Sequence, residues 1–190
     1  AAFVVVLSVT CFASYSFGVD EGKKLLALGS CERCDLSGAN LRGADLSGAW
    51  LREANLNKAD LQGAKLSDAW LFQANLTEAN LAGADLSKAE LTGADLQGAN
   101  LKGANLFKAK LWGADLRGAN LSQADLGQAE LTKANLTGAD LTGAILKKAT
   151  ILFPHQVNRS RTHGPGPTIF CKTKTPWGLD NSGCKIIADR

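Results

Sequence analysis

Ala39-Asn40-Leu41-Arg42-Gly43 is one copy of a five-residue unit that repeats along most of the chain. In this unit an alanine stands two places before a leucine, Asn or Asp usually stands just before the leucine, and two variable residues follow it. The leucine recurs every five residues from Leu36 to Leu146, which gives 23 consecutive units between residues 35 and 150. This array decides the fold.

A spacing of five matches neither an α-helix, which repeats about every 3.6 residues, nor a flat strand, which repeats every two. The chain must therefore turn at a fixed rhythm that returns every Ala and Leu to the same side, as a coil does. Glycine ends many units, for example at Gly43 and Gly103, and it adopts the positive φ of tight turns without strain. We expect each unit to form one side of a coil, and four units to close a turn of 20 residues.

The tandem A(D/N)LxG units resemble those of pentapeptide-repeat proteins over residues 35–150. The resemblance implies an all-β fold, a right-handed quadrilateral β-helix with leucine and alanine inside; the handedness comes from the resemblance alone. With neighbouring coils about 4.8 Å apart, about six coils would form a rod roughly 29 Å long.

The remaining residues suggest three further segments. Residues 1–19 are uncharged and largely apolar, which predicts either a cleaved signal peptide or a retained membrane anchor. Residues 20–34 are expected to cap the first coil, with a short amphipathic helix that begins at Asp20 and stops at Gly29. In residues 151–190 the period dissolves into a polar loop and a C-terminal cap.

Four of the five cysteines lie at the two ends of the array. Cys31 stands in the leucine register and Cys34 in the alanine register, so both should point inward, either as a disulfide or as buried thiols. A bond between Cys171 and Cys184 would close a loop and stabilise the tail by roughly 3 kcal/mol. One zinc site made of all four is excluded if the rod is real, because its two ends are too far apart.

Both ends of the chain also resemble the caps of pentapeptide-repeat proteins from the thylakoid lumen. The N-terminal resemblance lies in Leu25-Leu26 followed by Cys31-x-x-Cys34, and the C-terminal one in the segment 168–184. Trp177 departs from that pattern, because an acidic residue is expected there in a Pro-x-Gly turn. The resemblance implies a lumenal protein, soluble or anchored through residues 1–19, in a chloroplast or a cyanobacterium, with the periplasm as the alternative.

Residues 20 apart should stack on one face of the rod. Three of the four columns before the leucines are mostly Asn or Asp, but the fourth holds Trp50 and Trp70 followed by Glu, Lys and Glu. Arg52, Phe72 and Trp112 stand just after leucines on the same face. These aromatic residues either stabilise the coil by stacking or form a docking face for a partner protein, since Trp, Phe and Arg are typical of interface hot spots.

Charge and motifs argue against several classes of function. The formal net charge is +3, and Lys and Arg are scattered, so the sequence shows neither a basic stripe for nucleic acid nor an acidic surface. His155 and His163 have no nucleophile beside them, and Cys31-x-x-Cys34 lacks the βαβ context of a redox motif. We therefore expect no enzyme, no cofactor, no metal site, no nucleic-acid partner and no small-molecule substrate.

The sequence thus predicts a structural or interaction protein on the lumenal side of a thylakoid membrane, an accessory or assembly subunit of a photosynthetic complex. Two alternatives stay open at this point. One is a DNA mimic that binds gyrase, as in pentapeptide-repeat proteins that protect gyrase from quinolone drugs. The other is a periplasmic thiol-redox protein, which would need Cys31 and Cys34 to be accessible.

Overall fold

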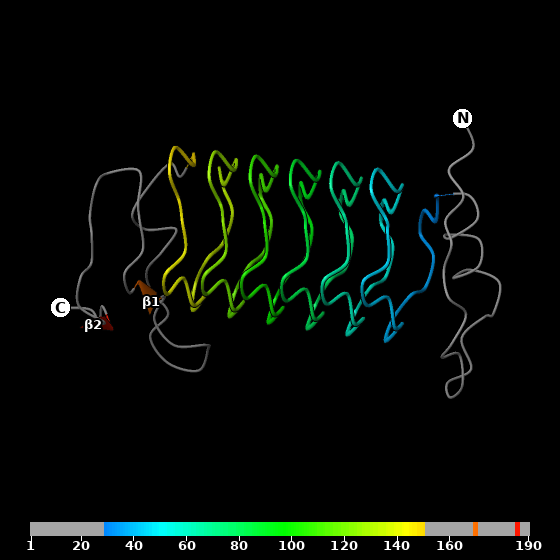
Figure 1. Cartoon of the computed structure of the whole chain (residues 1–190), viewed down its shortest axis with the longest axis horizontal. Helices are drawn as coiled ribbons and strands as arrows, with labels where there is room; N and C mark the ends of the chain where they lie inside the picture. The colour runs from blue at the N-terminus through cyan, green and yellow to red at the C-terminus, as the bar shows by residue number, and fades with distance from the viewer. Residues whose placement is uncertain (1–28, 151–168, 171–184, 187–190) are drawn as a thin grey trace.

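The computed structural model describes residues 29–150 and two short strands, β1 (Ile169–Phe170) and β2 (Lys185–Ile186). Residues 29–150 wind into a rod of stacked coils that runs along the long axis of Figure 1. β1 and β2 pair antiparallel, with Ile169 opposite Ile186. Residues 1–28, Cys171 and Cys184 lie outside the described residues, so the apolar segment, the capping helix and the C-terminal disulfide stay predictions.

The coil has four sides and a period of 20 residues, as the repeat predicts. Each residue before an inward leucine position forms a parallel β-bridge with the residue 20 places later, from Ser30 with Trp50 to Glu130 with Thr150. This regular pattern already includes residues 30–34, which the sequence assigned to the N-terminal cap. The fold is therefore a quadrilateral β-helix in which every side stacks on the same side of the next coil.

Backbone hydrogen bonds join the coils at three places in each unit. In the unit around Leu56, the Leu56 N–H donates to the Asn75 carbonyl at 2.7 Å and the Lys58 N–H donates to the Thr77 carbonyl at 2.9 Å. The Asn55 N–H donates in the opposite direction, to the Cys34 carbonyl at 2.8 Å. Because buried backbone groups are costly when unpaired, this ladder makes the stack of coils a stable continuous sheet.

Every side ends in a tight turn closed by a bond from the alanine N–H to the carbonyl of the preceding leucine, such as Ala59 to Leu56 at 3.0 Å. The residue two places after each inward leucine, or after Cys31 in the first coil, has positive φ, and twelve of these residues are not glycine. Glycine occupies many of these turns, as the sequence suggested, and other residues adopt the same conformation in the rest. A left-handed conformation costs a non-glycine residue roughly 1 kcal/mol, so the fold carries repeated strain that its hydrogen bonds must offset.

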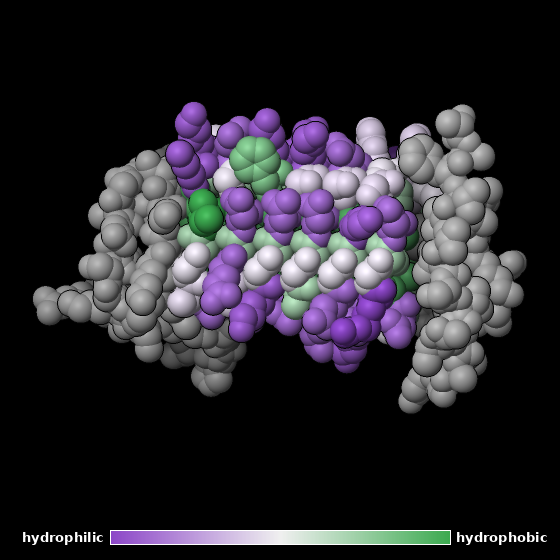
Figure 2. Space-filling model, in the orientation of Figure 1, coloured by the Kyte–Doolittle hydropathy of each residue, from purple (hydrophilic) through white to green (hydrophobic). Residues whose placement is uncertain are grey.

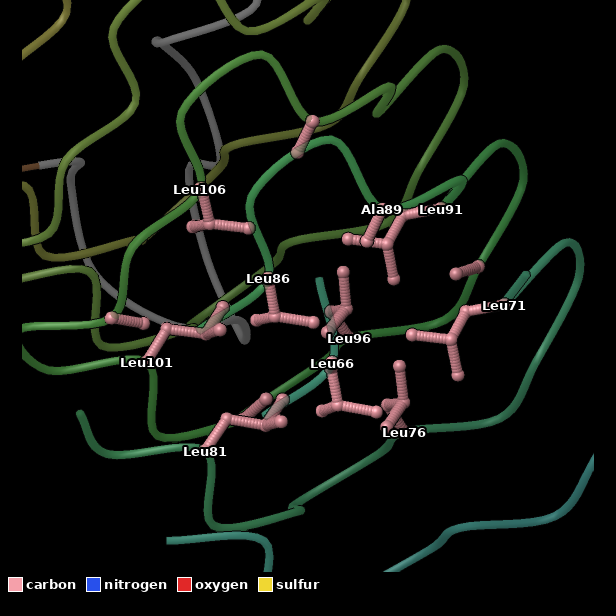
Figure 3. Close-up of a cluster of buried hydrophobic side chains, with 14 of the residues drawn as sticks. Leu66, Leu71, Leu76, Leu81, Leu86, Ala89, Leu91, Leu96, Leu101 and Leu106 are labelled. Carbon is pink, nitrogen blue, oxygen red and sulfur yellow. The ribbon is translucent and has the colours of Figure 1, made fainter. Parts of the chain in front are cut away.

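The core is a column of leucine and alanine side chains inside the coils. Figure 3 shows leucines of successive coils, among them Leu66, Leu86 and Leu106, pointing into the interior. From Leu51 to Leu131 every leucine and alanine of these two registers is 0% exposed. The core residues are nearly the same in every coil, so the coils differ mainly in their outer side chains. Features that could carry a specific function therefore lie on the outer surface.

Candidate partner-docking surface

The five residues predicted to form a docking face lie on one side of the rod. The residues are Trp50, Arg52, Trp70, Phe72 and Trp112. The whole side of the rod that carries them is called here the aromatic face. Parallel bridges join Trp50 to Trp70 and continue the same column through Glu90, Lys110 and Glu130. The other three members each stand two places after a residue of that column, so they occupy the same side.

The first group of contacts lies in the N-terminal half of this face. The rings of Trp50 and Trp70 stack with centroids 5.7 Å apart and an angle of 25° between their planes. The Arg52 guanidinium lies over the Phe72 ring, 5.4 Å from its centroid. Trp50 and Trp70 are nevertheless each 53% exposed, so stacking on each other leaves half of each side chain open to solvent.

Trp112 forms a second, separate group in the C-terminal half. It is 46% exposed, and the ammonium of Lys133 lies over its ring at 4.7 Å from the centroid. Between the two groups, Lys110 donates to Glu90 at 2.9 Å. Sequence reasoning missed Lys133, although its position one coil further along, beside the Trp112 column, could have indicated the contact.

Charged side chains on this face are paired with each other. Glu53 accepts from Arg33 at 2.7 Å and from Arg52 at 3.1 Å. The hydrogen bond and charge of Arg33, followed by the charge of Arg52, hold the pKa of Glu53 below its ordinary value. The hydrogen bond to Glu90 and its charge raise the pKa of Lys110. The ion pairs hold Arg52 in place over Phe72 and leave the tryptophans as the exposed apolar groups.

The bridge position has a different role on the other three faces. There, each Asn or Asp at this position accepts a hydrogen bond from the backbone N–H two residues later, as Asn100 does from Lys102 at 3.3 Å and Asp125 does from Gly127 at 2.8 Å. On the aromatic face the position holds Trp, Glu or Lys from Trp50 to Glu130, and in this described part of the chain none of these side chains accepts from the backbone N–H two residues later. On this face the side chains at the bridge position therefore do not cap the turns.

The rest of the described surface is mostly polar. Figure 2 shows one side of the rod, on which hydrophilic side chains form rows that run along its axis. Phe107, the aromatic residue of the array that lies away from the aromatic face, is half-buried. A Cβ at Gly127 would stand 3.1 Å from the Phe107 ring, so this glycine leaves room for the ring against the rod.

The two N-terminal cysteines lie in the first coil. A disulfide joins Cys31 and Cys34, whose Cα atoms are 5.5 Å apart, and the two residues are 2% and 5% exposed. Both occupy core positions, where their inward side chains extend the leucine and alanine columns. Such burial is typical of a structural bond and not of an exchanging thiol pair.

Nothing in the described residues points to catalysis. They contain no group of His, Cys, Asp and Glu side chains that could hold a metal ion. A polar hollow of about 570 Å³ lies at the C-terminal end of the rod and is lined by Gln128, Glu130, Thr132, Lys148 and Thr150. Within the same part of the chain, no helix is long and apolar enough to span a membrane. His155 and His163 lie outside the described residues.

Comparisons with known proteins agree with this architecture. The chain matches the family model described as Pentapeptide repeats in eight copies, over residues 30–69, 74–113 and 109–147. It is 30% identical to the pentapeptide repeat protein Rfr23 from the cyanobacterium Cyanothece 51142, over 70% of this chain and 99% of that one, with a TM-score of 0.49. No curated protein sequence matches it significantly.

Two other solved structures are similar in sequence. A pentapeptide repeat protein from Nostoc Pcc 7120 is 40% identical, over 50% of this chain and 78% of that one, with a TM-score of 0.44. A pentapeptide repeat protein from the Arabidopsis thaliana thylakoid lumen is 36% identical, over 63% of this chain and 70% of that one, with a TM-score of 0.22.

Proposed function

Because the chain belongs to the pentapeptide-repeat family, whose members form right-handed quadrilateral β-helices, we propose that it is a non-catalytic scaffold that binds a protein partner through its aromatic face. The rod supplies a rigid support, and the aromatic face supplies the contact. We place this scaffold on the lumenal side of a thylakoid membrane, as an accessory or assembly subunit of a photosynthetic complex.

The exposure of the three tryptophans carries the proposal. Trp50, Trp70 and Trp112 are about half exposed, although leucine and alanine already fill the core and do not need them. Trp and Arg are enriched among residues whose removal most weakens protein interfaces. Stacking alone would be expected to cover the rings, as Phe107 is partly covered beside Gly127.

The location rests on other features. The Cys31–Cys34 disulfide suits an oxidising compartment, because thiols in the cytosol are usually kept reduced. The resemblance of both chain ends to lumenal caps favours the thylakoid lumen over the periplasm. Peptide mass mapping of the protein from its native membrane, with and without reduction and after alkaline carbonate washing, tests this: Cys31 and Cys34 found as free thiols would contradict an oxidising compartment.

The docking role is tested by changing Trp70→Ala and Trp112→Ala together and isolating the protein after gentle solubilisation of its native membrane. We expect the double variant to lose a partner that the natural chain retains, while its circular dichroism is unchanged. Phe107→Ala is the matched control, because it removes an aromatic ring from another face. Equal recovery of the partner with the tryptophan variant and the natural chain would refute this docking site.

The DNA-mimic alternative is disfavoured by charge. A mimic of DNA needs a continuous acidic surface, whereas this chain has a formal net charge of +3 and its aromatic face pairs Glu53 and Glu90 with cations. A gyrase supercoiling assay with and without the protein separates the two functions. We expect no change in supercoiling.

A further inference from the structure

One edge of the aromatic face is formed by a column of turn residues with unusual composition. These residues stand two places before Trp50, Trp70 and their equivalents, and five of the six are not glycine; the column runs Gly48, Asp68, Lys88, Lys108, Gln128 and Lys148. All of the non-glycine members have positive φ, between 57° and 61°. The preceding column of turns, five residues earlier, holds glycine at five of its six places and Gln123 at the sixth.

This contrast shows that the turn itself does not require lysine. Positive φ is less favourable for lysine than for glycine, and glycine serves the same turn one column away. A backbone held in a disfavoured conformation is a reason to look for function at that place. Lys88, Lys108 and Lys148 are called here the lysine ridge.

The lysine ridge makes few contacts with its own rod. Among the described residues none of its three lysines takes part in an ion pair, and all three are exposed. The ammonium of Lys108 lies over the Phe107 ring at 5.3 Å and has no carboxylate partner among the described residues. Glu90, the carboxylate nearest in sequence to Lys88, is already bound by Lys110. Within the described residues the ridge thus carries positive charge without carboxylate partners, along the edge of the aromatic face.

Carboxylates near the lysine ridge limit the kinds of anion that could bind there. Asp68 lies in the same column, and Glu90 and Glu130 lie in the next one. A continuous polyanion, such as a nucleic-acid backbone or an anionic membrane, would meet these carboxylates as well as the lysines. A protein segment can place its own carboxylates opposite the lysines alone and apolar groups opposite the tryptophans.

We propose that the lysine ridge binds carboxylates of an acidic segment in the protein partner that docks on the aromatic face. The inference rests on the proposed function and names the chemistry of the partner. Lys88 and Lys108 are one coil apart, about 4.8 Å, and Lys148 is two coils further along. The partner segment therefore runs along the rod axis. Its acidic residues contact the C-terminal coils, and its apolar residues contact Trp50 and Trp70.

The test uses a labelled oligoglutamate peptide as the probe and two triple variants with the same change of net charge. One removes the ridge through Lys88→Gln, Lys108→Gln and Lys148→Gln. The other removes cations from the two faces away from it through Arg42→Gln, Lys58→Gln and Lys102→Gln. We expect the ridge variant to raise the Kd for the peptide about tenfold and the control variant to raise it less than about twofold.

Equal weakening by the two variants would overturn the proposal, because only net charge would then matter. Tighter, ridge-dependent binding of duplex DNA or of phosphatidylglycerol vesicles than of oligoglutamate would overturn it as well and would assign the ridge to a nucleic acid or a membrane. A third variant, with glycine at the three ridge positions, separates function from folding. It should bind oligoglutamate as weakly as the glutamine variant while its Tm stays unchanged or rises; a lower Tm would show a structural role and contradict the proposal.

Recovery of the native partner distinguishes this inference from the proposed function. If the partner is lost by the variant with Trp70→Ala and Trp112→Ala but retained by the ridge variant, the acidic segment is refuted and the docking face stands. If both variants retain it, the docking face is refuted too. Loss of the partner by both variants is the outcome that the two proposals predict together.

Discussion

The aromatic face and the face ten residues earlier in each coil have the same backbone structure, but their outer side chains have different roles. The earlier face, called here the asparagine face, has Asn or Asp at every bridge position: Asn40, Asp60, Asn80, Asn100, Asn120 and Asp140. Each of these side chains caps the turn that follows it, and Asn80, Asn100 and Asn120 also bond to one another across the coils. No residue of the aromatic face does the same within residues 29–150.

The difference shows how a uniform rod acquires a distinct surface. The core residues are the same on all sides, so burial cannot distinguish the faces. What differs is whether the outer side chain completes a hydrogen bond of its own turn or points to solvent. The asparagine face supports the fold, and the aromatic face presents groups for another molecule.

Asn100→Ala should destabilise the rod more than any other change considered below. It removes three hydrogen bonds, to the Lys102 N–H and to the side chains of Asn80 and Asn120, and we expect it to lower the free energy of unfolding by about 2 kcal/mol. The matched change on the aromatic face, Glu90→Ala, loses an ion pair with Lys110 and a hydrogen bond from the Thr92 hydroxyl, and should cost about 1 kcal/mol. Urea unfolding followed by circular dichroism measures both. Similar losses would show that the faces do not differ in this way.

Turn residues provide the second contrast. Gly83, beside the asparagine face, has a φ of 64°, and no atom lies within 4 Å of the place that a Cβ would take. Gly83→Ala should therefore destabilise the protein by about 1 kcal/mol through the backbone alone. Gln73, beside the aromatic face, has a φ of 54°, and Gln73→Gly should stabilise it by about 0.5 kcal/mol. Thermal unfolding of the two variants checks the signs. A loss of stability from Gln73→Gly would mean that its side chain supports the fold.

A missing turn cap can be restored on the aromatic face. Glu130→Asn places an amide oxygen where it can accept from the Thr132 N–H, as asparagine does on the other faces. We expect a gain of about 0.5–1 kcal/mol in the free energy of unfolding. Glu130→Gln is the control, because its longer side chain does not suit the same turn. If the two variants are equally stable, the caps contribute little.

The smallest effect is a pH dependence within the aromatic face. Hydrogen bonds from Arg33 and the charges of Arg33 and Arg52 lower the pKa of Glu53 from 4.5, so the unfolded state binds more protons than the folded state. The stability that this pairing contributes is present above pH 4.5 and is lost as the pH falls through the folded pKa. Tryptophan fluorescence should change in that window as Arg52 is released from Glu53. The change should be absent in Glu53→Gln, and its persistence there would assign it to another carboxylate.

The fold could be predicted from the sequence because its signal is repeated. A leucine every five residues from Leu36 to Leu146 indicates one type of backbone, a regular coil. The prediction rests on all of the units, so it does not depend on the interpretation of any single one. The 20-residue columns follow from the same count, and they place Trp50, Trp70 and Trp112 on one side of the rod. The inward positions of Cys31 and Cys34 follow in the same way.

Other parts of the site follow only in part from the period, because they also depend on side-chain conformation. The 20-residue columns place Lys133 near Trp112 and Arg33 near Glu53, but the contacts themselves are made from one coil to the next through flexible side chains. The glycines that end many units indicated the turns, but they did not show that Lys88 and Gln73 adopt the same positive φ. Residues 1–19 and the Cys171–Cys184 bond remain predictions from sequence.

Oxidative footprinting of the tryptophans, read by mass spectrometry, compares the protein in its native membrane complex with the released protein. If the aromatic face binds the partner, oxidation of Trp50, Trp70 and Trp112 should fall in the complex, while oxidation of Phe107, on another face, should be the same in both. Equal oxidation of the three tryptophans in the complex and in the released protein would contradict docking through this face.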